Sequence, residues 1–182
     1  MYPGLVPYRM VYVTAALAAV PVLILTLMYR ENHQVPQGKI PVSRFRSSFV
    51  TFFSHTGLRA TAFVDMATYF SFGAFETFLP LFLASEGFDP YLTGIIFAVQ
   101  VLIIAGTKPF FGNLADHSDK RIQIIAGLII LGGSVALIPL TTGFIPILFV
   151  SAVFGLGISL STVATSAYIA DIAQKEQIGA SM

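Results

Sequence analysis

Long apolar runs separated by short polar turns make up most of the chain. A helix needs about 20 apolar residues to cross a hydrocarbon core of ~30 Å. The runs that meet or approach this length are Met10–Tyr29, Arg59–Leu83, Tyr91–Gly112, Ile122–Thr142 and Pro146–Ala170. We therefore predict five membrane-spanning helices. The first run is longer than the apolar part of a secretory signal, so we interpret it as a spanning helix and not as a cleaved leader.

Composition places the chain among membrane proteins. Apolar residues make up 55% of it and charged residues only 10%, whereas soluble domains carry about a quarter charged residues. The predicted fold class is an all-α, polytopic membrane helix bundle. The absence of cysteine excludes a disulfide scaffold and thiolate metal sites. A net charge of +1 gives no reason to expect nucleic acid as a partner.

The loops predict an orientation, because lysine and arginine gather on the cytoplasmic side of membrane proteins. The segment Arg30–Arg59 carries several basic residues and one acid, Glu31. The turn ending in Lys120 and Arg121 is also basic, whereas the loops on the opposite side hold only acidic charges. We expect the N-terminus outside, the C-terminus in the cytoplasm, and the protein in the plasma membrane.

The long basic segment divides the chain into three parts. Residues 1–29 form a lone span, residues 30–58 a cytoplasmic linker, and residues 59–182 a group of four spans. The second half of the linker carries four phenylalanines at helical spacing, Phe45, Phe49, Phe52 and Phe53. This pattern suits a short helix at the membrane interface, or equally an extension of the following span.

The turn GNLADHSDKR, residues 112–121, gathers charge beside two spans. It resembles the loop signature of the major facilitator superfamily: a glycine, a leucine, a small residue, an aspartate and a basic pair. The matching residues here are Gly112, Leu114, Ala115, Asp116, Lys120 and Arg121. Two positions depart from the signature. His117 replaces the usual arginine, and Asp119 replaces a glycine that permits a left-handed turn, a conformation aspartate tolerates.

The resemblance implies a position within the family's fold. Two spans and a long linker precede the turn, which matches the weaker, second copy of the signature. The chain then looks like span six, the central loop and spans seven to ten. The segment Asp171–Met182 is similar to the loop that follows span ten. On this reading the chain is a fragment, and its partners include the N-terminal half and the last helices of the same protein.

The charges of the signature have a physical interpretation as well. An anion such as Asp116 is favoured before the helix that starts near Ile122, where amide groups lack partners. The basic pair, Lys120 and Arg121, can anchor the loop among anionic lipid headgroups. These charges either set topology alone or, as the resemblance implies, form contacts between helix ends that hold one conformation of a cytoplasmic gate.

Ionisable residues inside a span usually face a cavity or a partner, because burying them in lipid is costly. Asp65, Tyr69, Phe72 and Glu76 return to one face of their helix, and the two acids lie about 16 Å apart along its axis. Glu76 is a candidate for binding a proton or a cationic substrate. The alternatives are a structural hydrogen bond or an outer vestibule. Asp65 suits an interfacial capping role.

Two further polar residues lie within the span Tyr91–Gly112. Lys108, near its inner end, can extend to the headgroups along its aliphatic stem or form a charge pair with Asp65 or Asp116. Gln100 lies near the middle and requires a partner helix, a water molecule or a substrate. We keep Gln100 as a candidate for lining a cavity.

The last span is rich in small and hydroxyl residues, which usually serve helix packing. The resemblance implies that spans seven and ten line a central cavity. On that basis the candidates for the cavity are Ser159, Thr162 and Ser166, which share one face. The glycines of the preceding span, Gly127, Gly132 and Gly133, are interpreted as packing residues only.

The sequence shows no phosphate-binding loop, no paired metal ligands and no nucleophile with a base, so we predict neither a cofactor nor an enzyme. The function we predict for the parent protein is secondary active transport of a small-molecule substrate by alternating access, with proton-coupled efflux as one form, and we expect the fragment by itself to be inactive. The alternatives are a membrane scaffold that does not transport, or an intramembrane enzyme using Asp65 and Glu76. Membrane lipid is the other expected partner.

Overall fold

The computed structural model describes residues 56–180, with side chains up to residue 172, and ten positions between residues 13 and 28. The chain divides into two units, Met1–Pro41 and Val42–Met182. In the first unit every described position is helical and exposed, in agreement with part of the predicted first span. The rest of that span and the predicted interfacial helix lie outside the described residues. The unit boundary falls within the predicted linker, and the three-part division stays a prediction.

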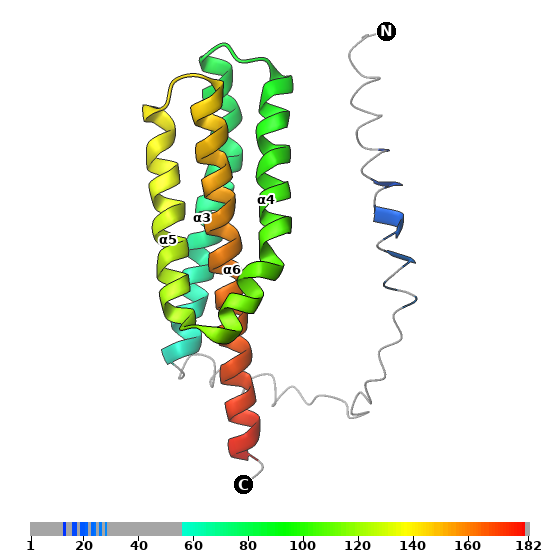
Figure 1. Ribbon diagram of the computed structural model, residues 1–182, viewed down its shortest axis with the longest axis vertical. Helices are drawn as coiled ribbons and strands as arrows, with labels where there is room; N and C mark the ends of the chain where they lie inside the picture. The colour runs from blue at the N-terminus through cyan, green and yellow to red at the C-terminus, as the bar shows by residue number, and fades with distance from the viewer. Residues whose placement is uncertain are drawn as a thin grey trace, which may run out of the picture. The chain divides into compact units, whose positions relative to one another are not determined.

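The second unit is a bundle of four long helices (Figure 1). They are α3 (Thr56–Ser85), α4 (Pro90–His117), α5 (Lys120–Leu137), which continues as a short 3-10 helix (Ile138–Leu140), and α6 (Phe144–Ala180). All four are long and apolar enough to cross a membrane. The fold class is therefore confirmed: the described part is an all-α bundle of membrane-spanning helices. Each helix begins and ends within a few residues of its predicted limits, apart from the longer end of α6.

Helix α6 is the central element of the bundle. In α6, 56% of the stretch that best fits a membrane span is buried inside the bundle. The corresponding share is 11% to 28% in the other three helices. Figure 1 shows α6 running between α4 and α5 along most of its length. The small residues Gly155 and Gly157 permit this central place, because neighbouring helices can approach the α6 backbone closely there.

The turns at one end of the bundle depend on glycine. Gly87 lies two residues after the end of α3 and Gly143 precedes α6, with φ of 81° and 89°, a region that other residues rarely adopt. At the end of α3 the amide of Gly87 donates to Ala84 and that of Phe88 donates to Leu83. These bonds satisfy carbonyls that the last helical turn leaves free. The α3–α4 and α5–α6 turns lie together at this end (Figure 1).

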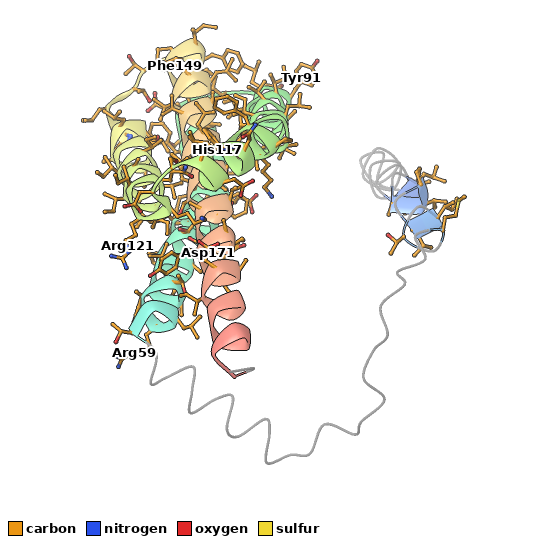
Figure 2. The ribbon with its side chains drawn as sticks, turned by 60° about the horizontal axis from the view of Figure 1, so that its bottom comes forward. Arg59, Tyr91, His117, Arg121, Phe149 and Asp171 are labelled. Carbon is orange, nitrogen blue, oxygen red and sulfur yellow. The ribbon has the colours of Figure 1, made fainter. Side chains whose placement is uncertain are left out.

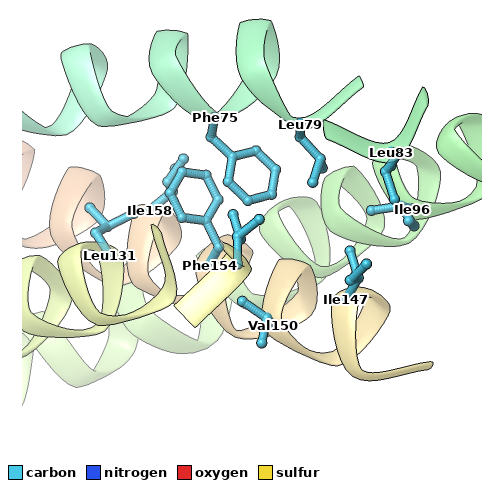
Figure 3. Packing of buried hydrophobic residues seen from close by; sticks show 10 residues of the cluster. Phe75, Leu79, Leu83, Ile96, Leu131, Ile147, Val150, Phe154 and Ile158 are labelled. Carbon is cyan, nitrogen blue, oxygen red and sulfur yellow. The ribbon is translucent and has the colours of Figure 1, made fainter. Parts of the chain in front are cut away.

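A compact apolar core fills the half of the bundle nearest these turns (Figure 3). The rings of Phe75 on α3 and Phe154 on α6 stack with their centroids 4.0 Å apart. Phe97 on α4 meets Phe75 edge to face. The other core members come from all four long helices and the 3-10 segment: Leu79, Leu83, Ile96, Leu131, Ile138, Ile147, Val150 and Ile158.

The outside of the bundle is apolar too. Each helix exposes large apolar side chains, among them Phe70, Leu102, Ile129 and Phe149, which are 68% to 78% exposed. A soluble protein rarely leaves so much apolar surface uncovered, whereas a lipid environment favours it. The outward-facing side chains therefore agree with a bundle that is surrounded by hydrocarbon.

Candidate functional site

The predicted signature turn is built from the end of α4 and the start of α5. Residues 112–117 belong to α4, and only Ser118 and Asp119 lie between the helices. Asp119 is the N-cap of α5, since its Oδ1 accepts a hydrogen bond from the Arg121 amide at 2.9 Å. Its φ of −67° is not left-handed. The left-handed conformation that aspartate tolerates is therefore not used at Asp119, which serves as the cap of α5 in extended backbone.

Asp116 does not take the capping role that its position suggested. It lies exposed in the last turn of α4, three residues before the N-cap. Within residues 56–172 it forms no ion pair. At the start of α5 the carboxylate of Asp119 accepts a hydrogen bond from the amide of Arg121, which would otherwise lack a partner.

Both basic residues of the turn contact side chains of α6. Lys120 Nζ lies 2.8 Å from Asp171 Oδ2. Arg121 Nη2 donates to the Tyr168 hydroxyl at 3.4 Å, and its guanidinium lies 5.8 Å from the centre of the Tyr168 ring. Contacts between helix ends were one of the two alternatives for Asp116 and the basic pair; Lys120 makes such a contact with Asp171, whereas Asp116 does not. Figure 2 shows Arg121 and Asp171 at the same end of the bundle as Arg59.

Tyr168 and Asp171 were not singled out as partners from the sequence. Both lie on α6, three residues apart, so they face the same side of that helix. The only signal for them is this spacing near the C-terminal end of an apolar span. It becomes informative once α6 is known to pack beside the start of α5. Together the two contacts join the start of α5 to the C-terminal part of α6.

The polar face of α3 lies on the outside of the described bundle. Glu76 and Tyr69 are exposed, and Asp65 is half-buried. None of the three hydrogen-bonds or forms an ion pair with the described residues. Glu76 therefore has no neighbouring helix in residues 56–172 to supply the structural hydrogen bond that was the alternative to a functional role.

Lys108 also lies on the outside. It is exposed on α4, one residue before Pro109, which lies inside the helix. It forms no ion pair with Asp65 or Asp116 in the described part of the chain. The predicted charge pair is therefore absent from this structure, and extension of the lysine toward the headgroups remains.

Gln100 and Ser159 do not line a cavity. Gln100 is buried, with 1% exposed, where α4 crosses α6. A methyl group placed on Gly155 would lie 3.1 Å from the Gln100 carbonyl, so the helices nearly touch. Ser159 donates to the Ile104 carbonyl at 3.4 Å in the same interface. The expectation of cavity-lining positions is wrong for both residues in this structure, because the α4–α6 contact covers them.

The other two hydroxyl candidates on α6 are more open. Thr162 is half-buried and Ser166 is exposed. Each donates to a backbone carbonyl one turn earlier, Thr162 to Ile158 at 2.8 Å and Ser166 to Thr162 at 2.9 Å. Helical hydroxyls commonly satisfy themselves this way in membranes. They can accept a further hydrogen bond, and their role in a cavity stays a prediction.

A buried polar contact on the other side of α6 was missed from the sequence. The hydroxyls of Thr68 on α3 and Ser161 on α6 lie 3.1 Å apart. Gly127 on α5 packs directly against Ser161, since a methyl group there would lie 2.8 Å from the Ser161 amide nitrogen. The packing interpretation of Gly127 agrees with this contact. Gly132 and Gly133, by contrast, have open space beside them, so their packing interpretation is not supported within the described bundle.

Among the described residues no group of three or more His, Cys, Asp or Glu side chains is placed to hold a metal. The Nδ1 atom of His117 lies 2.8 Å from the carbonyl oxygen of Asn113, one turn earlier in α4. The arrangement that remains is a cluster of charge at one end of an apolar bundle and a polar face along α3.

Comparison with known proteins agrees with these features. The family model described as Major Facilitator Superfamily matches residues 2–182. No curated protein and no solved structure matches the chain. The match covers nearly the whole chain, including the turn between α4 and α5. The chain belongs to the major facilitator superfamily, and it is a multi-pass membrane transporter of that superfamily.

Proposed function

We propose that the protein carries a small solute by alternating access, with the polar face of α3 lining the pathway. The observation that supports this proposal is the exposure of Glu76 and Tyr69 within a span. A carboxylate that faces hydrocarbon costs about 2.5–3.5 kcal/mol or more. A water-filled pathway removes this cost. We therefore expect the polar side chains of α3 to contact water, substrate or further helices of the same protein.

The position of Glu76 favours a cationic partner. It lies on α3 between the half-buried Asp65, eleven residues earlier, and the outer turn at Gly87. No basic side chain pairs with it in residues 56–172. An unpaired carboxylate inside a transport pathway attracts a cationic substrate and is a candidate for carrying a proton. Proton-coupled efflux of a lipophilic cation is the form of transport that we propose.

The charge distribution supports a cytoplasmic position for the α4–α5 turn. Arg59, Lys108, Lys120 and Arg121 all lie toward the end of the bundle that carries this turn. The α3–α4 turn at the opposite end carries the acids Glu86 and Asp89 and no basic residue. This asymmetry follows the positive-inside rule. We therefore propose that the inner ends of α5 and α6, joined by Lys120 and Asp171, form part of a cytoplasmic gate in the plasma membrane.

A transport measurement tests the proposal. Cells that express the protein are loaded with ethidium, and its efflux is followed in the presence and absence of a proton gradient. Glu76→Gln is expected to lower gradient-driven efflux by about tenfold or more, equivalent to at least ~1.4 kcal/mol in the barrier. Glu86→Gln is the matched control, because Glu86 is an exposed acid in the adjacent turn. Equal efflux by the wild type and Glu76→Gln would exclude Glu76 from the pathway.

A further inference from the structure

A cavity of about 450 Å³ opens between the inner ends of α3, α5 and α6. Its walls are mostly apolar and include Ala60, Val64, Ile124 and Ile125. Arg121 and Tyr168 complete the lining. The proposed transport pathway does not use this cavity. It lies within the usual size range of a small-molecule site, with an apolar wall and a few converging polar groups.

No carboxylate within residues 56–172 forms an ion pair with the cation at this cavity. The Arg121 guanidinium is held by the Tyr168 hydroxyl and ring, and no carboxylate pairs with it among residues 56–172. This differs from the adjacent Lys120, which is paired with Asp171. The nearby acid Asp119 accepts the Arg121 backbone amide as the cap of α5. Within the described residues the guanidinium therefore has hydrogen-bonding capacity left for an anion from outside.

A second guanidinium lies beside the same cavity. Arg59 precedes Ala60, and its Nη2 donates to the hydroxyl of Thr56 at 3.3 Å. Thr56 is itself part of the cavity lining. Arg59 is exposed and forms no ion pair in the described part of the chain. Figure 2 shows Arg59 and Arg121 pointing outward from the same end of the bundle.

The seam between α3 and α5 offers an internal comparison. Near its other end lies a cavity of about 220 Å³, lined by side chains such as Phe78, Phe82 and Ile138. None of its lining residues is charged. The interface between α3 and α5 therefore holds two apolar cavities. The larger one is lined by Arg121, and the smaller one, near the other end, is lined by no charged residue. An occupant of the first needs both an anion and a hydrocarbon part.

We propose that the cavity lined by Arg121 and Tyr168 is a binding site for an acidic phospholipid of the cytoplasmic leaflet. The phosphate lies against Arg121 and Arg59, and the adjoining acyl chain covers Val64 and Ile125. Acidic lipids gather in this leaflet, and each basic residue near it contributes about 1 kcal/mol to their binding. The site rests on the proposed cytoplasmic position of this end. A soluble phosphate ester would leave the apolar wall uncovered, which favours the lipid.

The chain has no tryptophan, so a single introduced one reports on a single place. Ile125→Trp places it at the proposed site, and Phe78→Trp places it at the uncharged cavity. Both positions are well exposed, at 58% and 65%. The protein is reconstituted in phosphatidylcholine vesicles that contain brominated phosphatidylglycerol or brominated phosphatidylcholine as the quencher, and quenching is measured for each variant.

In Ile125→Trp, brominated phosphatidylglycerol is expected to quench at about fivefold lower mole fraction than brominated phosphatidylcholine, the factor for one basic contact. In Phe78→Trp the two lipids are expected to quench equally. Adding Arg121→Gln to Ile125→Trp removes the preference, whereas adding Lys108→Gln leaves it intact. Circular dichroism confirms that each variant remains helical.

Three results would overturn the site. The first is an equal response of Ile125→Trp to both lipids. The second is an equal loss of preference with Lys108→Gln and Arg121→Gln, which would indicate general surface charge. The third is relief of quenching by glycerol 3-phosphate in solution, which would assign the cavity to a free phosphate ester. These outcomes are independent of the ethidium assay, since Glu76 is not part of the cavity.

Discussion

Lys120 Nζ on α5 lies 2.8 Å from Asp171 Oδ2 on α6, and this ion pair joins the start of α5 to the C-terminal part of α6. The lysine side chain is 18% exposed and the aspartate 47%, so water screens the pair only in part. The contact connects the turn after α4 to the central helix of the bundle. It explains why a basic residue is needed at the start of α5, where the helix dipole by itself disfavours one.

The ion pair predicts a measurable coupling. In a double-mutant cycle with Lys120→Gln and Asp171→Asn, we expect a coupling energy of about 0.5–1 kcal/mol, near the upper range for partly exposed pairs. The measurement is unfolding by SDS in mixed micelles. The matched cycle pairs Lys120→Gln with Asp116→Asn, and we expect no coupling there because Asp116 forms no ion pair. Equal coupling in the two cycles would refute the assignment to Asp171.

The cap of α5 gives a second prediction. Asp119→Ala removes the side chain that accepts the Arg121 amide, and we expect a loss of about 1 kcal/mol in the free energy of unfolding. Asp119→Asn retains an accepting oxygen and is expected to lose less. Asp116→Ala is the control, since Asp116 caps no helix start. The account fails here if Asp116→Ala destabilises the protein as much as Asp119→Ala.

The buried contact between α3 and α6 gives a third prediction. Thr68→Val removes the hydroxyl that lies 3.1 Å from Ser161 Oγ. Buried hydrogen bonds between membrane helices contribute about 0.6 kcal/mol on average. We expect that coupling in the cycle of Thr68→Val with Ser161→Ala, measured by SDS unfolding. Thr77→Val, an exposed threonine on the same helix, is expected to have little effect. A larger loss at Thr77 would contradict the packing described for α3.

The approach of α5 to α6 gives a fourth prediction. A methyl group on Gly127 would lie 2.8 Å from the backbone nitrogen and 2.9 Å from the Cβ of Ser161, too close for either to remain in place. We expect Gly127→Ala to destabilise the bundle by about 1–3 kcal/mol, the usual cost of overpacking. Gly132→Ala is the control, because nothing lies within 4 Å of the added methyl group. Equal stabilities of the two variants would show that the helices are farther apart.

The sequence predicted the helices well because their signal is local. An apolar run bounded by polar turns determines where α3, α4 and α5 begin and end, whatever they pack against. The charged turn was also found from local features. Its internal roles were not, because Asp116 and Asp119 are both short acids before a helix, and only the backbone at Asp119 shows which one is the cap.

Contacts between helices could not be predicted in the same way. Gln100 and Ser159 are polar residues of the kind that line cavities. They are nevertheless buried between α4 and α6, because Gly155 lets the two backbones approach each other. Ser161 looks identical to its neighbours in the sequence and differs only by facing Thr68 and Gly127. Which face of α6 meets which helix depends on long-range packing, and a hydrophobic pattern that is nearly uniform around the helix does not encode it.

We propose that the face of α3 with Asp65, Tyr69 and Glu76 lines a water-filled pathway. Because the chain has no cysteine, single cysteines can test this directly. Glu76→Cys probes the polar face, and Phe70→Cys is the matched control on a lipid-facing side of α3, where Phe70 is 78% exposed.

The decisive measurement is the rate of labelling in intact membranes with a charged, membrane-impermeant thiol reagent, compared with a permeant one. The account predicts that the charged reagent labels Glu76→Cys and leaves Phe70→Cys unlabelled, while the permeant reagent labels both. Labelling of Glu76→Cys by the permeant reagent alone would mean that this face of α3 lies in lipid or against protein, and it would contradict the proposed pathway.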